Sequence, residues 1–243
     1  MIDYLADDEK LKSFFSNRPN LNGIGNSIKT RLNYKTDRLA LVECLNNQYQ
    51  SVKTSEKVLN NIESLKKQNV FTVCTAHQPN IFTGHLYFIY KIIHAIKLAE
   101  ELNQSFADYS FVPVYYMGSE DADLNELAEV FINGKDYKWK TQQSGAVGRM
   151  NVDEELISII NDVEAHLSNE PYGPDILTKI KSAYSKGKTI QQATFEFVNE
   201  LFQNYGLIVL MPDSKELKRL FNEVVEKELT TQFSKKEIGR AHV

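Results

Sequence analysis

The spacing of apolar positions changes near residue 66. Before that point Leu39, Val42, Leu45 and Tyr49 recur every three or four residues, which is the period of an amphipathic helix. We expect helices over residues 37–67 and a short helix that starts at residues 7–9 and ends before Pro19. The Asn- and Gly-rich stretch 20–26 predicts a loop. Residues 1–66 are therefore interpreted as a helical N-terminal segment.

From residue 67 to residue 236, short apolar runs alternate with helical patterns. The runs at 70–73, 111–117 and 207–211 predict buried strands, and Asn133-Gly134 predicts a hairpin turn between two short strands. Helices are expected over 85–102, 153–167, 174–185 and 190–205, and a last one from a cap at Asp213 or Ser214 to about Thr230. Such alternation is typical of an α/β fold with a mostly parallel sheet.

The last seven residues, 237–243, match no pattern before them. They can be encoded by nucleotides that, after the first base, match the start of a common short-read sequencing adapter. We therefore expect that these residues are not native, that the reading frame is lost after Lys236, and that the core 67–236 is incomplete.

Composition narrows the class of protein. Apolar residues make up 42% of the chain and charged residues 25%, as in soluble globular proteins. The net charge of −4 gives no basic surplus for nucleic acid. No signal peptide or membrane-spanning run is evident. Cys44 and Cys74 suggest neither a disulfide nor a metal site, and Cys74 is expected to be a small buried residue. We expect a cytoplasmic protein.

The stretch 70–102 is the first candidate for chemistry. A strand, a polar loop and a long helix follow one another, an order that can direct backbone N–H groups and a helix N-terminus at an anion. The backbone of residues 82–86 and the Thr83 hydroxyl are the expected donors. His77 and Gln78, at the end of the strand, could orient a carboxylate or phosphate, or only bond the loop backbone.

Charged side chains follow the second strand. Glu120, Asp121 and Asp123 could bind an ammonium group, hold Mg²⁺ carried by a nucleotide, or act as a base. The alternative is a capped helix start with a solvated acidic turn. Arg149 is suited to bidentate pairing with a carboxylate or phosphate, or to a surface ion pair.

Three sequence blocks carry a resemblance to a known family. They are residues 77–84 with Leu86-Tyr87 and Tyr90-Lys91, residues 112–116 leading into 119–123, and residues 147–150. Their order and spacing resemble the bacillithiol biosynthesis cysteine-adding enzymes, or cysteine ligases, over nearly all of residues 1–236. The chain departs from the family pattern at His85, where Pro is more frequent, and at Ala122, where His is.

The resemblance implies a Rossmann-like core, followed further along the chain by a helical coiled coil that supports a homodimer. It implies addition of cysteine to glucosaminyl-malate as the last step of bacillithiol synthesis. Amide formation needs an activated carboxylate, usually through ATP, so ATP and Mg²⁺ are expected cofactors. We assign His77, Asp121 and Asp123 to catalysis, no residue to a metal of the protein itself, and to substrate or nucleotide binding Gln78, Asn80, Thr83, Gly84, Glu120 and Arg149.

Two other functions stay open on the sequence. A nucleotidyltransferase of related fold would release an adenylylated product. A non-catalytic nucleotide- or thiol-binding module would bind ligand without turnover.

Overall fold

The computed structural model describes residues 2–6, 8–232 and 234. The predicted non-native tail, residues 237–243, lies outside these residues.

Three of the described strands form a parallel sheet. They are β1 (Val70–His77), β2 (Ser110–Met117) and β5 (Ile208–Leu210), in the order β1-β2-β5. Cys74 is in register with Val114, and Val114 with Ile208. Helix α5 (Tyr87–Ser105) connects β1 to β2. The predicted α/β fold with a parallel sheet is confirmed.

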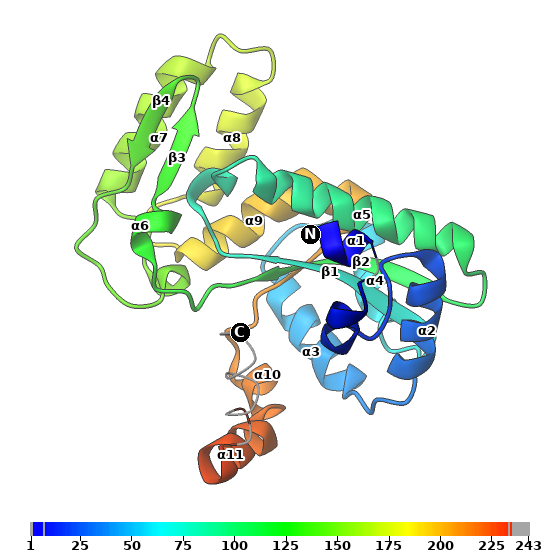
Figure 1. Cartoon of the computed structure of the whole chain (residues 1–243). Helices are drawn as coiled ribbons and strands as arrows, with labels where there is room; N and C mark the ends of the chain where they lie inside the picture. Colours follow the sequence, from blue (N-terminus) through cyan, green and yellow to red (C-terminus); the bar gives the residue numbers. More distant parts are fainter. Residues whose placement is uncertain (1, 7, 233, 235–243) are drawn as a thin grey trace.

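Helices cover the sheet and enclose a core. In Figure 1, α5 lies above the sheet and α3 (Arg38–Tyr49) below it. Helix α4 (Glu56–Ser64) and helix α9 (Ile190–Phe202) contribute to the same apolar cluster. Tyr115, at the centre of β2, is fully buried within it. Burial on both faces explains why β2 reads as a continuous apolar run.

Strand β1 differs from its predicted burial. Its burial alternates along the strand, and Cys74 is exposed, so the expectation of a buried Cys74 is wrong. The physical reason is that one face of β1 is uncovered: Thr72, Cys74 and Ala76 are exposed, whereas Phe71 and Val73 pack in a cluster with residues of α5. In addition, β1 lies at the edge of the described sheet and pairs with β2 alone. An apolar run therefore predicted the strand correctly but not its place in the sheet.

The N-terminal segment contains α1 (Ile2–Leu5), a 3₁₀ helix η1 (Glu9–Phe14) and α2 (Leu21–Arg31). The loop predicted over residues 20–26 is wrong, because α2 begins there. The Asn20 side chain accepts a hydrogen bond from Gly23 N at 2.9 Å and caps the helix. A Cβ at Gly23 would lie 1.9 Å from Arg18 O, so glycine here permits a close approach. Asn20 and Gly23, whose residue types suggest a loop, thus lie at the start of a helix.

A second apolar cluster lies beyond the end of β2. It involves α6 (Leu124–Leu127), the antiparallel hairpin β3 (Glu129–Ile132) and β4 (Lys135–Lys138), the 3₁₀ helix η3 (Val147–Arg149), α7 (Glu154–Leu167) and α8 (Gly173–Ala183). Asn133 and Gly134 have φ of 51° and 83°, as expected at the predicted hairpin turn. Trp139 is buried in this cluster, and its Nε1 donates to Asp153 Oδ1 at 2.8 Å.

The predicted last helix is divided in two. After α9 and the 3₁₀ helix η4 (Gln203–Tyr205), the chain forms β5, then α10 (Lys215–Arg219) and α11 (Asn222–Thr231). Ser214, not Asp213, caps α10. Figure 1 shows α10 and α11 projecting from the body of the molecule. Among the described helices, none has the length and apolar character needed to cross a bilayer.

Candidate functional site

A groove of about 400 Å³ lies at the carboxyl ends of the parallel strands. In open α/β sheets this edge is where ligands bind. We call it the strand-end groove. Its lining comes from the ends of β1 and β2 with the residues that follow them, and from the segment after β5. The lining residues are Ala76, His77, Gln78, Tyr116, Gly118, Ser119, Glu120, Asp121 and Pro212. The structure thus brings two of the three sequence blocks to one edge.

His77 is the last residue of β1 and contributes a buried imidazole to the groove. Its ring stacks on Tyr87 with centroids 5.0 Å apart, and its Nδ1 lies 2.7 Å from Gln78 Oε1. Its Nε2 has no hydrogen-bond partner among the described residues. Burial lowers the pKa of His77 below its ordinary value, and the nearby Lys91 lowers it further. The imidazole is therefore neutral at pH 7.

Gln78 connects His77 to Asp121. Its Nε2 donates to Asp121 Oδ2 at 3.1 Å, while Asp121 Oδ1 accepts from Asp123 N at 2.9 Å. The backbone bond from Asp123, followed by the bond from Gln78, lowers the pKa of Asp121. Asp121 is therefore an ionised carboxylate, a weak base and a good partner for a cation.

An ion-pair network connects Arg149 to Glu120, which lines the groove. We call this network the rim cluster; it consists of Glu120, Arg149, Asp213 and Lys218. Arg149 Nε and Nη2 donate to Asp213 Oδ2 and Oδ1 at 2.6 and 2.7 Å. Lys218 Nζ lies 2.6 Å from both Asp213 Oδ1 and Glu120 Oε1. The bond from Arg149, reinforced by Lys218, lowers the pKa of Asp213 to about 2. Arg149 thus pairs with a carboxylate as predicted, but with one of the protein's own.

Two members of the rim cluster were not predicted from the sequence as site residues. Asp213 lies three positions after the end of β5, which is a usable signal, although its position also suits a helix cap. Lys218 lies in the helix after it, and nothing in its local sequence sets it apart from the other lysines of the chain. The fold alone brings Lys218 to Glu120.

The third block joins the groove through a glycine. Gly148 N donates to Ser119 O at 3.0 Å, and Val147 N donates to Asp121 O at 2.8 Å. A Cβ at Gly148 would lie 2.4 Å from Ser119 O, closer than side-chain atoms pack. The absence of a side chain at Gly148 therefore lets η3 contact the loop after β2, and this contact positions Arg149.

Other predicted site residues lie outside the groove. Thr83 and Gly84 line a separate, apolar cavity of about 740 Å³. Thr83 Oγ1 donates to Phe82 O at 2.6 Å, and Gly84 N to Ile81 O at 2.9 Å. Phe82 N donates to the Tyr184 hydroxyl at 3.2 Å. These donors bond within the fold, so the geometry gives no support to a phosphate cradle there.

Asn80 and Asp123 have structural positions. Asn80 is fully buried, and its Nδ2 lies 3.5 Å from Glu126 O. Asp123 caps α6 by accepting from Glu126 N at 3.3 Å. This arrangement matches the alternative of a capped helix start.

The three carboxylates after β2 do not converge on one point. Glu120 pairs with Lys218, Asp121 with Gln78, and Asp123 with the backbone of α6. In the part of the chain that the structure describes, no three His, Cys, Asp or Glu side chains could together hold a metal ion. These residues do not fit a Mg²⁺ site, and no chemical step is assigned to one.

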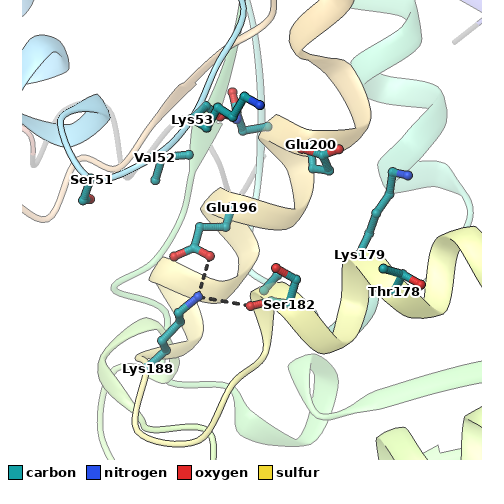
Figure 2. Close-up of a pocket in the computed structure, with 11 residues that line it drawn as sticks. Ser51, Val52, Lys53, Thr178, Lys179, Ser182, Lys188, Glu196 and Glu200 are labelled. Atoms are coloured by element: carbon teal, nitrogen blue, oxygen red, sulfur yellow. Dashed lines mark hydrogen bonds and ion pairs between the residues drawn. The ribbon is translucent and has the colours of Figure 1, made fainter.

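A second polar cavity lies elsewhere. Figure 2 shows it between the loop at residues 51–53 and helices α8 and α9. Its volume is about 580 Å³. Its Lys188 Nζ bonds Glu196 Oε2 at 2.5 Å and Ser182 O at 3.2 Å. None of its lining residues comes from the strand ends or from the three sequence blocks. The strand-end groove is therefore the stronger candidate.

A parallel sheet under helices, with polar side chains gathered at the carboxyl ends of its strands, defines a Rossmann-like α/β domain. Residues 1–242 match the family described as "Bacillithiol biosynthesis BshC, N-terminal Rossmann-like domain". The chain belongs to this family, which confirms the resemblance of the three blocks.

Curated relatives agree with this assignment. A protein of Cytophaga hutchinsonii named "Putative cysteine ligase BshC" is 38% identical over 233 residues, which are 95% of this chain and 42% of that protein. Relatives of the same name from Flavobacterium johnsoniae and Natranaerobius thermophilus are 35% and 29% identical, over 97% and 94% of this chain and 45% and 44% of theirs. The chain thus spans less than half the length of these relatives.

Proposed function

We propose that this chain is the Rossmann-like part of a cysteine ligase of bacillithiol biosynthesis, and that the strand-end groove holds its reacting groups. The single observation that carries the proposal is the meeting of the family's sequence blocks at this groove: His77-Gln78 from the first, Ser119–Asp121 from the second, and Gly148-Arg149 packed on Ser119 from the third. Membership of the family supports the reaction class.

The proposed reaction joins the carboxyl carbon of cysteine to the amine nitrogen of glucosaminyl-malate. The attacking nitrogen must lose a proton as the amide forms. Neutral His77 is suited to take that proton, because burial keeps its imidazole unprotonated at pH 7. Asp121, with its lowered pKa, is better suited to hold the substrate ammonium before attack.

Activation of the cysteine carboxylate through ATP is part of the proposal, since hydroxide is a poor leaving group. The N–H groups of residues 82–84 and the Thr83 hydroxyl donate within the fold, so none of them is assigned to the phosphates of ATP. We expect glucosaminyl-malate and cysteine to be the small-molecule substrates.

The test uses a protein that carries this chain within the full length of its relatives. Bacillithiol is measured by mass spectrometry after incubation with cysteine, glucosaminyl-malate and ATP. His77→Ala and Asp121→Ala should each reduce its formation roughly 100-fold, the scale of a lost acid–base group. His94→Ala and Asp136→Ala, at exposed positions outside the groove, are the matched controls.

Full activity of both groove variants would overturn the site. Pyrophosphate release from ATP in the absence of cysteine would instead indicate a nucleotidyltransferase. Substrate binding without any product would indicate a binding module.

A further inference from the structure

Asp213 is a buried carboxylate between two exposed cations. Its side chain is 8% exposed, whereas those of Arg149 and Lys218 are 60% and 43% exposed. Asp213 lies three positions after the end of β5, and Arg149 ends η3, so the pair connects two segments 64 residues apart. Because the Asp213 carboxylate is buried and the Arg149 guanidinium is exposed, the ion pair holds the guanidinium in one orientation.

The bidentate geometry leaves one edge of Arg149 open. A guanidinium carries five N–H donors in a planar fork. Asp213 takes the donor on Nε and one on Nη2, at 2.6 and 2.7 Å. Three donors remain, and two of them, one on Nη1 and one on Nη2, lie along the edge that Asp213 does not cover. That edge can take a second carboxylate in the same bidentate manner.

The strand-end groove, whose lining includes Glu120 of the rim cluster, has two buried side-chain atoms that the described residues leave without a partner. They are Ser119 Oγ and His77 Nε2, on residues that are 0% and 7% exposed. Gly148 N donates to Ser119 O at 3.0 Å, so Arg149 directly follows a residue that packs on the groove lining. Buried polar groups normally have hydrogen-bond partners, which an ordered water or a polar group of a ligand can supply.

We propose that Asp213 is a positioning residue: it holds Arg149 so that the Nη1/Nη2 edge receives a carboxylate group of the substrate while the rest of the substrate lies in the strand-end groove. Lys218 keeps Asp213 and Glu120 together and adds a second positive charge at the rim. The inference rests on the proposed function for the identity of the substrate, and on the geometry for the class of ligand, a small carboxylate such as malate.

The test is a double-mutant cycle on malate binding, with the protein that carries this chain within the full length of its relatives. Binding of L-malate is measured by isothermal titration calorimetry, without turnover. Asp213→Asn and Arg149→Lys should each raise the Kd for malate about tenfold. The double variant should be no weaker than Arg149→Lys alone, because Asp213 acts through Arg149. Arg219→Lys, exposed on α10, is the control.

Three outcomes would overturn the inference. An unchanged Kd for malate in Asp213→Asn would leave Asp213 with a structural role only. A lower Kd would show that Asp213 competes with the ligand for Arg149. Additive losses in the double variant would show that the two residues act separately. Steady-state kinetics add a further check, since a positioning role predicts a raised KM for the carboxylate substrate with kcat little changed.

The outcomes also separate this inference from the proposed function. Coupled loss of malate binding in a protein that makes no bacillithiol would support the inference and refute the reaction. Bacillithiol synthesis with a KM that Asp213→Asn leaves unchanged would do the reverse.

Discussion

The strand-end groove and the loop at the start of α5, residues 80–86, both follow β1 and both resemble anion-binding elements in sequence. In the groove, Ser119 Oγ and His77 Nε2 are buried and have no partner among the described residues. In the loop, the N–H groups of Phe82, Thr83 and Gly84 donate to Tyr184, Asn80 and Ile81. The groove thus has two buried side-chain atoms without a partner, whereas the loop uses the N–H groups of residues 82–84 to hold its own conformation. Asn80 Oδ1, at the start of the loop, is also without a partner among the described residues.

The difference shows what makes a strand–loop–helix segment bind anions. Phe82 and Thr83 adopt positive φ angles of 51° and 60°, which are uncommon for residues with side chains. Such a turn is held in place by internal hydrogen bonds and by the burial of Phe82. Donors that maintain a strained turn are not available to phosphate, whatever the likeness of the segment to a phosphate loop.

The largest effect should come from Gly148→Ala. The new Cβ would lie 2.4 Å from Ser119 O, so η3 must move away from the groove. Overpacking of this kind costs about 3 kcal/mol of unfolding free energy at its upper range. Urea denaturation of Gly148→Ala against Gly118→Ala checks it, because a Cβ at Gly118 meets Gln78 Cγ at an ordinary 3.6 Å. Equal stability of the two variants would refute the described contact.

Asp213→Asn should have a smaller effect that depends on pH. The folded pKa of Asp213 is lowered to about 2, from 3.8 ordinarily, so its stabilisation is present above pH 4 and lost as pH falls toward 2. We expect Asp213→Asn to lower the free energy of unfolding by about 1 kcal/mol at pH 7, since its partners are solvent-screened. The difference from the wild type should shrink in urea titrations between pH 4 and pH 2. A difference that persists unchanged at pH 2 would contradict the ion pair.

His77 should give a shallower pH dependence of the same sign, in a higher pH range. Its folded pKa is below the ordinary 6.5, chiefly through burial, so the unfolded chain binds the proton first as pH falls. The wild type should therefore lose stability between pH 7.5 and pH 5.5, and His77→Gln should lose less. The exposed His94→Gln serves as the control. Parallel pH curves for wild type and His77→Gln would argue against a buried neutral imidazole.

Thr83→Val should have the smallest effect. It keeps the β-branched shape and removes only the hydroxyl that donates to Phe82 O. We expect a loss of about 0.5 kcal/mol in unfolding free energy and no change in affinity for ATP or malate. A marked loss of ATP affinity, measured by calorimetry, would return the phosphate role to the loop and reverse the comparison.

Much of the fold could be predicted from the sequence, because local spacing carries the information. The three parallel strands, the hairpin at Asn133-Gly134 and helices α7 to α9 all lie where the apolar pattern places them. Helix α2 could not be predicted this way: its Asn and Gly residues are loop formers by composition, and they form a helix start because Gly23 packs on Arg18. Exposure of Cys74 likewise depends on which face of β1 the helices leave uncovered.

The candidate site divides along the same line. Residues at strand ends, such as His77, Gln78 and Asp121, could be nominated from the sequence because parallel strands end at one edge of a sheet. Lys218 could not, since it reaches Glu120 across 98 positions of the chain. For Thr83 and Gly84 the sequence could not show that the donors of their loop are occupied. One of these donors, Phe82 N, bonds the Tyr184 hydroxyl, which lies 102 positions further along the chain.

By itself, the sequence determined most of the secondary structure, the α/β class and the family, because these depend on spacing and on short blocks read along the chain. The tertiary structure decided which blocks share a groove, that Arg149 pairs with Asp213, and that the N–H groups of residues 82–84 donate within the fold. Those outcomes depend on distances between residues far apart in the sequence, and the folding of the chain sets these distances.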